Sequence, residues 1–290
     1  MIVLSKNNPR GIIWLASYPR SGNTWTRAFI HTLTHLMRDP DFQDVDINRL
    51  EEDNASESKA DLYSQMLGKP AHRASGAEIA SVRPRIQAAI ARQLNRPVYI
   101  KTHNANSLDH GFPIINMGVS AGAVYIVRNP LDVVISFAAF SSQTIDHAIE
   151  AMATPGYGVQ TTRTHVRVIT GSWSENVGSW TARPHPAIHA VRYEDLMADP
   201  VRYFGGVARH LLMTPREDQI VRAVELTGFE RLKAKEAAAG FAERPDTTTQ
   251  FFRAGKTGQW RDTLTDDQVA RMVAAHRPLM TRFGYLPDGA

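Results

Sequence analysis

Residues 12–25 read IIWLASYPRSGNTW, an apolar run followed by a short Ser/Gly loop and the start of a helical pattern. The run from Ile12 to Leu15 is typical of a buried strand in a parallel sheet. Gly22 lets the backbone turn tightly because it has no Cβ, and an amphipathic helical pattern follows over 24–37. Backbone N–H groups and the positive end of the helix dipole then face one small region. The segment therefore predicts an anion-binding turn at the end of a strand.

The side chains of this loop suit a phosphate or a sulfate. Arg20, Ser21, Asn23 and Thr24 can all donate hydrogen bonds to such an anion. The usual nucleoside-triphosphate loop, GxxxxGK[ST], has a Lys for the phosphates and a hydroxyl for magnesium. Here no Lys follows Gly22, and the cation is Arg20. A strand–turn–helix junction that binds nothing can also contain Ser and Gly, so the loop alone leaves that alternative open.

Apolar runs and helical patterns alternate along the 290 residues. Strand-like runs lie at 12–16, 97–100, 123–127 and 187–191. Helical patterns lie near 24–37, 78–93, 130–140, 163–180, 200–212, 216–226 and 266–282. Such alternation predicts an α/β fold with a mostly parallel central sheet flanked by helices. Without an internal repeat or a low-complexity linker, we expect a single domain over 1–290, with a core at 11–262 and a C-terminal helix at about 266–282.

Composition excludes several kinds of site. The chain has no cysteine, which excludes disulfides, thiolate metal ligands and a cysteine nucleophile. The sequence also offers no HExxH motif or Cys/His cluster, so we expect no metal. No stretch approaches the ~18 consecutive apolar residues of a membrane span, and the N-terminal residues lack the pattern of a signal peptide. We therefore expect a cytoplasmic protein that is not integral to a membrane.

The charge is distributed unevenly. The formal net charge is +4, yet residues 39–61 carry nine acidic side chains against Arg49 and Lys59. The rest of the chain has 31 basic and 20 acidic residues, and this surplus suits an anionic ligand. Because there is no dense Lys/Arg run and no basic-aromatic stripe, we expect no nucleic-acid partner. The acidic segment is expected to be a solvated surface loop.

Polar motifs follow the ends of all four expected strands. They are SYPRSGNTW (17–25), KTHN (101–104), RNPLDVVIS (128–136) and RYEDL (192–196). In parallel sheets, ligands bind beyond the carboxyl ends of the strands, which is where we expect these motifs. A fifth segment, residues 240–260, reads GFAERPDTTTQFFRAGKTGQW. Its length and its Gly, Pro and Thr content predict a long irregular loop, which we interpret as a lid.

Five motifs, SYPRSGNTW, YIKTHN, VRNPLDVVIS, RYEDL and FFRAGKTGQW, occur in this order and together resemble sulfotransferases of the cytosolic and bacterial type. These enzymes use 3′-phosphoadenosine 5′-phosphosulfate (PAPS) as the donor and release adenosine 3′,5′-bisphosphate (PAP). The resemblance spans about residues 12–262. It implies a P-loop-like fold with a C-terminal lid. It also implies that six residues of the first loop hold the 5′-phosphosulfate: Arg20, Ser21, Gly22, Asn23, Thr24 and Trp25.

The resemblance implies further donor contacts. Arg128 and Ser136 match residues that bind the 3′-phosphate, and the lid residues Arg253 and Gly255 match residues that close on the same phosphate. From the residues alone, Arg128 paired with Asp132 and a solvent-facing Ser136 would be the simpler interpretation. Contacts with adenine are implied at three further positions: Tyr193, Thr227 and Phe229.

The chain departs from the family pattern at three of these positions. Arg20 stands where the family usually has Lys, and Asn23 stands where it usually has Thr. Arg keeps the charge but spreads it over a planar fork, so whether Arg20 also assists the leaving group stays open. Ala254 occupies a position that is usually basic, and Lys256 is a candidate to replace it. For Trp25, core packing on the helix face is as good an interpretation as contact with adenine.

His103 is the expected catalytic base. It follows the strand at 97–100 and lies two residues after Lys101. An imidazole with an ordinary pKa of ~6.5 can accept a proton from the acceptor near neutral pH. Lys101 and Arg20 would stabilise the charge that develops in an in-line transfer. The resemblance thus implies transfer of a sulfuryl group to a hydroxyl or an amine of a small-molecule or glycan acceptor.

Two other functions remain to be weighed against this one. A P-loop-type small-molecule kinase that uses ATP and magnesium is disfavoured by the missing GK[ST] motif. A non-catalytic nucleotide-binding module is disfavoured by the presence of His103. The acceptor, whether alcohol, phenol, amine or sugar, is left open, and so is a homodimer. The family's dimer motif would fall at 261–270, where Asp266 and Ala270 replace its Val and Glu.

Overall fold

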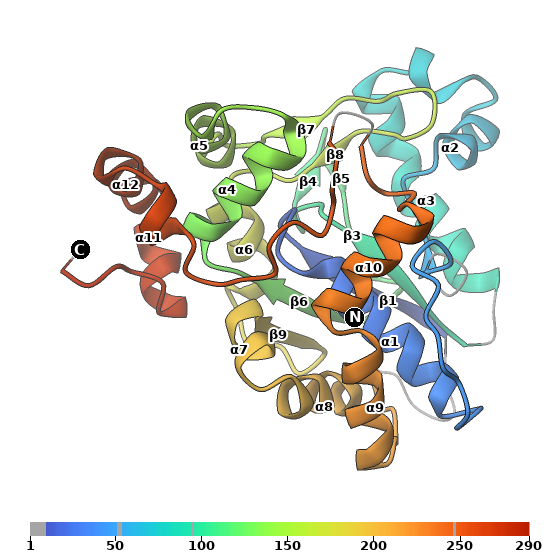
Figure 1. The fold of residues 1–290 in the computed structure, drawn as a ribbon. Coiled ribbons are helices and arrows are strands. Elements are labelled where there is room, and N and C mark those ends of the chain that lie inside the picture. The colour runs from blue at the N-terminus through green and yellow to red at the C-terminus, as the bar shows by residue number, and fades with distance from the viewer. Residues whose placement is uncertain (1–9, 51–53, 94–95, 246–247, 290) are drawn as a thin grey trace. The chain divides into compact units, whose positions relative to one another are not determined.

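The computed structural model describes residues 10–50, 54–93, 96–245 and 248–289. Its main sheet, of which β3, β1, β6 and β9 are labelled in Figure 1, has five strands in the order β2-β3-β1-β6-β9. In that order, their bounds are Asn54–Ala55, Pro97–Thr102, Gly11–Ser17, Ser120–Val127 and Ile188–Arg192. All four strands that the sequence predicts are among them. Strand β1 pairs in parallel with β3, from Gly11 opposite Pro97 to Ala16 opposite Thr102, and β3 pairs in parallel with β2.

The central strands are buried throughout. Every residue of β1 and of β6 is buried, as expected for a parallel sheet that is covered on both faces. The chain nevertheless groups into two compact units, which are described separately. Unit 1 comprises Met1–Pro19, Asn54–Tyr125 and Ala151–Ala190. Unit 2 comprises Arg20–Asp53, Ile126–Glu150 and Val191–Ala290. The boundaries of a single domain stay a prediction.

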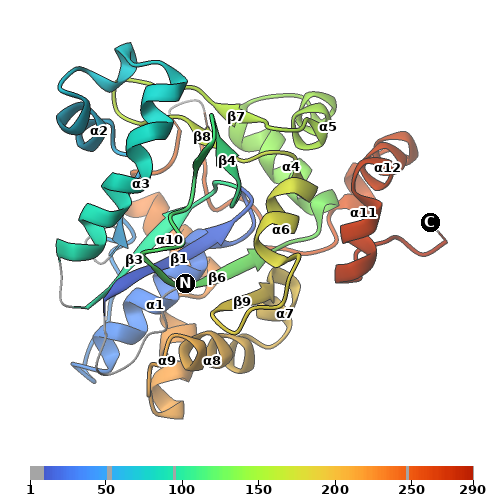
Figure 2. The same cartoon turned by 180° about the vertical axis from the view of Figure 1, so that it is seen from behind.

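Unit 1 contains most of the sheet and its flanking helices. These helices are α2 (Ala60–Leu67), the short 3-10 helix η1 (Ala71–Arg73), α3 (Gly76–Gln93) and α6 (Trp173–Thr181). Helix α3 packs against β1 and β3 (Figures 1 and 2). Two small antiparallel pairs complete the unit: β4 (Leu108–Asp109) with β5 (Phe112–Pro113), and β7 (Gly158–Val159) with β8 (Val168–Ile169).

The prediction of a helix at 163–180 is wrong for residues 163–172. Val168 and Ile169 form β8 instead, because they pair with β7. Gly171 then takes a φ of 66°, which interrupts any helix. Helix α6 begins only after Ser172, whose hydroxyl accepts a hydrogen bond from the Glu175 N–H while the Glu175 carboxylate accepts one from the Ser172 N–H.

Unit 2 is mainly helical. Its helices are α1 (Asn23–Leu36), α4 (Pro130–Ser141), α5 (Ile145–Ala153, which crosses the unit boundary), α7 (Tyr193–Ala198), α8 (Pro200–His210), α9 (Glu217–Leu226), α10 (Phe229–Ala239), α11 (Trp260–Thr263) and α12 (Asp266–Phe283). Helix α1 packs against α8 and α9, and α4 packs against α11 and α12 (Figures 1 and 2). The sequence pattern did not predict helix α10. Only Leu232 and Glu236 are buried along it, so the helix lacks the broad apolar face that makes a helical pattern recognisable.

The acidic segment 39–61 is only partly a solvated loop. Val45, Ile47 and Leu50 are buried in an apolar cluster of unit 2 that includes Phe241, while the aspartates between 39 and 46 are exposed. Glu57 contradicts the expectation, since only 2% of it is exposed. Residues 51–53 lie outside the described part of the chain. In that described part, no helix has the length and apolar character needed to span a membrane.

Candidate functional site

The predicted anion-binding loop lies between β1 and α1 in the chain. Gly22 precedes α1 with a φ of 101°, a left-handed conformation that favours glycine. A Cβ on this residue would lie 2.7 Å from Cδ2 of Tyr193, so a methyl group could enter only if the Tyr193 ring moved. No side chain of the described residues caps α1, and its first turn holds no acidic residue. The positive end of the helix dipole is therefore not neutralised from within the helix.

Arg20 extends from this loop toward α4 and the lid. Its Nε donates to Ser136 Oγ at 3.0 Å, and its Nη2 donates to the Phe251 carbonyl oxygen at 2.8 Å. The guanidinium also lies over the Phe140 and Phe251 rings, at 4.9 and 4.2 Å from their centroids. The structure thus brings Arg20 together with Ser136, the residue predicted to bind the 3′-phosphate.

Arg128 follows β6 in the chain and lies beside the same loop. Its Nη1 donates to the Arg20 carbonyl oxygen and its Nη2 to the Lys256 carbonyl oxygen, both at 3.0 Å. Its guanidinium lies 4.4 Å from the centroid of the Tyr193 ring. The contact of Lys256 with Arg128 is therefore made by the Lys256 backbone carbonyl oxygen.

The alternative pairing of Arg128 with Asp132 is not what the structure shows. The buried Asp132 carboxylate instead accepts hydrogen bonds from the N–H groups of Gly258, at 2.6 Å, and Trp260, at 3.1 Å. Asp132 therefore holds the C-terminal end of the lid.

Three arginines, Arg20, Arg128 and Arg253, lie close enough for their charges to act on one another, and they are called the arginine cluster below. Burial, together with the charges of Arg128 and Arg253, lowers the pKa of Arg20 to about 10. Like charges disfavour one another's ionised form, and a bound anion relieves that repulsion. The charge of Glu236 offsets part of this repulsion at Arg20, and an anionic ligand would offset more of it.

The lid is irregular, as predicted: its described residues form no helix or strand before α11. A second buried carboxylate holds its middle. Glu236 of α10 accepts hydrogen bonds from the N–H groups of Phe251, at 2.6 Å, and Phe252, at 2.8 Å. Nothing in the sequence pointed to this role, because a Glu within the Ala-rich run of α10 resembles a solvated residue.

The predicted phosphate contacts of the lid are Arg253 and Gly255. Arg253 is exposed, and its Nη2 donates to Gln259 Oε1 at 3.4 Å. Gly255 has a φ of 58°, and a Cβ on it would overlap the Phe229 ring. Any other residue at 255 would therefore push the lid away from Phe229, one of the predicted adenine contacts.

The remaining predicted adenine contacts lie in an aromatic region. Trp25 meets Tyr193 edge-on, with centroids 6.0 Å apart, and Phe204 edge-on at 4.9 Å. Trp25 also packs against the apolar cluster of unit 2, so it does pack on the core, as the alternative interpretation held. Thr227 is buried and directly follows α9, and its hydroxyl donates to the Ala223 carbonyl oxygen at 2.7 Å.

Buried polar atoms at this site test whether it fits a phosphate-bearing donor. Ser21 Oγ, Trp25 Nε1 and Arg128 Nε are buried and have no hydrogen-bond partner among the described residues. Leaving a buried donor unsatisfied costs about 1–3 kcal/mol. Ser21 Oγ and Arg128 Nε, beside the arginine cluster, fit a ligand that supplies phosphate oxygens, whereas Trp25 Nε1 lies in the aromatic region.

The predicted catalytic pair belongs to unit 1. Lys101 lies in β3, and His103 follows that strand. His103 Nδ1 lies 2.9 Å from the Ser17 carbonyl oxygen. The Ser17 hydroxyl oxygen lies farther from Nδ1, at 3.4 Å. Because a carbonyl oxygen only accepts, the shorter contact favours the tautomer with the proton on Nδ1 and the lone pair on Nε2. The His103 carbonyl oxygen in turn accepts from Asn176 Nδ2 at 3.0 Å. This tautomer is the one that a general base acting through Nε2 requires.

Comparison with known proteins identifies the family. A family model described as the sulfotransferase domain matches residues 11–284. Flavonol 3-sulfotransferase of Flaveria bidentis is 25% identical over 272 residues, which cover 90% of this chain and 78% of that protein. Sulfotransferase 1B1 of Mus musculus is 25% identical over 285 residues, which cover 93% of this chain and 83% of that protein.

Solved structures share the fold. Retinol dehydratase in complex with androsterone and PAP superposes with a TM-score of 0.63 at 19% identity, over 94% of this chain and 82% of that one. Mouse sulfotransferase SULT7A1 complexed with PAP gives 0.61 at 18% identity, over 96% and 85%. These likenesses confirm the predicted α/β fold, and the family model confirms the resemblance drawn from the five motifs. The chain belongs to the sulfotransferase family.

Proposed function

We propose that the protein transfers a sulfuryl group from PAPS to a hydroxyl or an amine of a small-molecule or glycan acceptor. The observation that carries the proposal is the arginine cluster of unit 2, where buried donors without partners lie beside aromatic rings. PAP combines two phosphate groups with an adenine ring, so it matches both features. Two solved relatives, retinol dehydratase and SULT7A1, hold PAP.

Different residues of unit 2 would hold different parts of the donor PAPS. Ser21, with the N-terminal end of α1, would hold the 5′ end. Arg128 and Arg253 would hold the 3′-phosphate with Ser136, which is already hydrogen-bonded to Arg20. Trp25 and Tyr193 would meet the adenine, where stacking is worth on the order of 1–3 kcal/mol. The other donor contacts are proposed from the family resemblance: Gly22, Asn23, Thr24, Thr227, Phe229 and Gly255. Two of these side chains accept hydrogen bonds from Arg27, Asn23 Oδ1 at 3.1 Å and Thr24 Oγ1 at 3.3 Å.

The chemistry assigned to the protein is proton transfer and charge stabilisation. PAPS supplies the sulfuryl group and leaves as PAP. His103 Nε2 accepts the acceptor's proton as the acceptor atom attacks, while Nδ1 keeps its hydrogen bond to the Ser17 carbonyl oxygen. Lys101 and Arg20 provide positive charge for the oxygens on which negative charge develops. Arg20 would first have to exchange its hydrogen bonds to Ser136 and Phe251.

Ligand binding followed by product analysis tests this proposal. Thermal unfolding with PAP is compared with unfolding with ATP and magnesium, and stabilisation by PAP alone is expected. Stabilisation only by ATP and magnesium would instead favour the kinase. Acceptors are then screened with PAPS by mass spectrometry, beginning with apolar alcohols, since androsterone and retinol are the molecules bound to retinol dehydratase. The acceptor, a homodimer and a cytoplasmic location stay predictions.

A further inference from the structure

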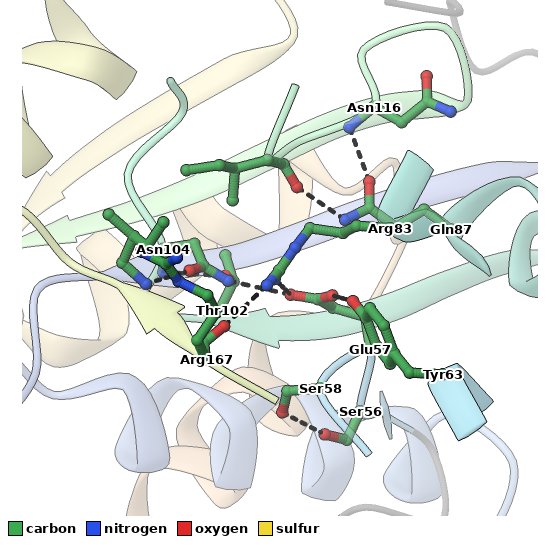
Figure 3. Close-up of polar contacts among 12 residues, drawn as sticks. Ser56, Glu57, Ser58, Tyr63, Arg83, Gln87, Thr102, Asn104, Asn116 and Arg167 are labelled. Atoms are coloured by element: carbon green, nitrogen blue, oxygen red, sulfur yellow. Dashed lines mark hydrogen bonds and ion pairs between the residues drawn. The ribbon is translucent and has the colours of Figure 1, made fainter. Parts of the chain in front are cut away.

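Glu57 is a buried acid within a segment whose other described acids are exposed. Its two carboxylate oxygens accept three hydrogen bonds (Figure 3). Oε2 accepts from the Tyr63 hydroxyl at 3.1 Å. Oε1 accepts from Arg83 Nη1 at 3.4 Å and from Asn104 Nδ2 at 3.0 Å. Burial raises the pKa of the Tyr63 phenol, and the Glu57 charge raises it further, so Tyr63 stays a neutral donor.

Asn104 connects this carboxylate to the residue next to it, His103. The Asn104 side chain donates to Glu57 and accepts from the Ile169 N–H at 2.7 Å. Its backbone carbonyl oxygen accepts from Trp180 Nε1 at 3.0 Å. Every one of these partners belongs to unit 1. Asn104 is therefore held from several sides. The 103–104 peptide itself is bound by Asn176 Nδ2, which donates to the His103 carbonyl oxygen, and by Thr102 Oγ1, which accepts from the Asn104 N–H at 3.1 Å.

Stability alone does not account for a buried charge in this place. A buried ion pair such as Glu57 with Arg83 often adds no net stability, because both ions lose their hydration. An apolar pair of similar volume would fill the same space. What a carboxylate adds is an acceptor that orients the Asn104 amide: with Nδ2 turned to Glu57, Oδ1 faces the Ile169 N–H.

We propose that Glu57 is a positioning residue for His103, which it orients through Asn104. The inference rests on the proposed role of His103 as the base. The Glu57 carboxylate fixes the Asn104 side chain, and this adds to the hydrogen bonds of Asn176 and Thr102 that hold the 103–104 peptide. The imidazole then keeps its hydrogen bond to the Ser17 carbonyl oxygen, with the lone pair on Nε2. Arg83 neutralises the carboxylate, and its Nη2 also donates to the Arg167 carbonyl oxygen at 2.7 Å.

A reciprocal exchange tests the proposal. Asn104→Asp keeps the acceptor for Ile169 but sets two carboxylates against each other. At pH 8 we expect kcat to fall between about tenfold and a hundredfold, as for a misplaced catalytic group, with the PAP affinity unchanged. Adding Glu57→Gln reverses the hydrogen bond, because the new amide nitrogen, in the place of Oε1, donates to the new carboxylate. The charge of the cluster is kept, and the cost is that Arg83 Nη1 loses Oε1 as its acceptor. The double variant should recover kcat to within about threefold of wild type.

The matched control is Tyr63→Phe. It removes a hydrogen bond from the same carboxylate but leaves the contact with Asn104, so kcat is expected to stay near wild type even if the melting temperature falls. All variants are assayed well below their melting temperatures, so that each is fully folded. A wild-type kcat in Asn104→Asp overturns the proposal. So does a double variant that recovers its melting temperature without recovering kcat.

A spectroscopic measurement separates this proposal from the proposed function. Long-range ¹H–¹⁵N spectra of the histidine ring, assigned with His103→Ala, report which nitrogen carries the proton. We expect the Nδ1–H tautomer in the wild type and the double variant, and a mixture in Asn104→Asp. The same tautomer in all three overturns the positioning role whether or not transfer is observed. Absence of PAPS-dependent transfer in the wild type, with these spectra as expected, refutes the proposed function alone.

Discussion

Gly22→Ala is the substitution whose effect follows most directly from the geometry of the donor loop. With a φ of 101°, an alanine here costs about 1–2 kcal/mol in the backbone alone. Its Cβ would lie 2.7 Å from Tyr193 Cδ2, so the ring must move by about 0.7 Å to reach ordinary contact at 3.4 Å. Tyr193 supports the Arg128 guanidinium. The displacement therefore reaches a predicted phosphate ligand, and we expect the Kd for PAP to rise about tenfold to a hundredfold.

Gly284→Ala separates the backbone cost from the displacement of the ring. Gly284 has a φ of 69°, and a Cβ there would meet nothing within 4 Å. It ends α12 in the same unit. The two variants are compared by urea unfolding and by calorimetric titration with PAP. Gly284→Ala should lose about 1 kcal/mol of stability and bind PAP as the wild type does. Wild-type affinity in Gly22→Ala would refute the link from Gly22 through Tyr193 to the phosphate site.

Three other predictions concern the cluster, the lid and pH. Arg20→Met removes one of three neighbouring charges and should weaken PAP binding at least about tenfold in calorimetric titration. Arg20→Lys keeps the charge and should keep most of the affinity. Equal PAP affinities of the Met and Lys variants would contradict this. Glu236→Gln leaves one buried lid N–H without an acceptor and should lower the free energy of unfolding by about 1–3 kcal/mol in urea; an unchanged midpoint would count against it. Burial lowers the pKa of His276 from 6.5 to about 4, so between these values the unfolded chain binds a proton that the folded chain does not. Stability, measured by urea unfolding, is therefore lost as the pH falls from about 6.5 to about 4, by about 3 kcal/mol in all, and His276→Leu should lose less over the same range.

Local patterns predicted the parts of the site that local chemistry determines. The apolar run before Gly22 and the amphipathic pattern after it specify a strand, a turn and a helix within a few residues, and the structure has all three. The sequence also predicted the irregular conformation of the lid, because its Gly, Pro and Thr residues disfavour regular structure. In each case the deciding residues are neighbours in the chain.

Contacts between distant residues were beyond the sequence. Glu57 and Arg83 are 26 positions apart, and an acid among eight others gives no sign that it will be buried. The short distance in the chain between Asp132 and Arg128 favours an ion pair, yet Asp132 accepts from backbone N–H groups 126 and 128 positions away. In both cases the partner of the carboxylate is determined by how distant parts of the chain pack in the fold, which local sequence patterns do not show.

The most direct test of the central claim is transfer itself, measured by mass spectrometry with PAPS and the acceptor that the screen identifies. The wild type is expected to add one sulfo group to the acceptor and to release one PAP for each. His103→Ala is expected to bind PAP with wild-type affinity and to give no product above background. No product with any acceptor from the wild type, or wild-type turnover from His103→Ala, would contradict the account.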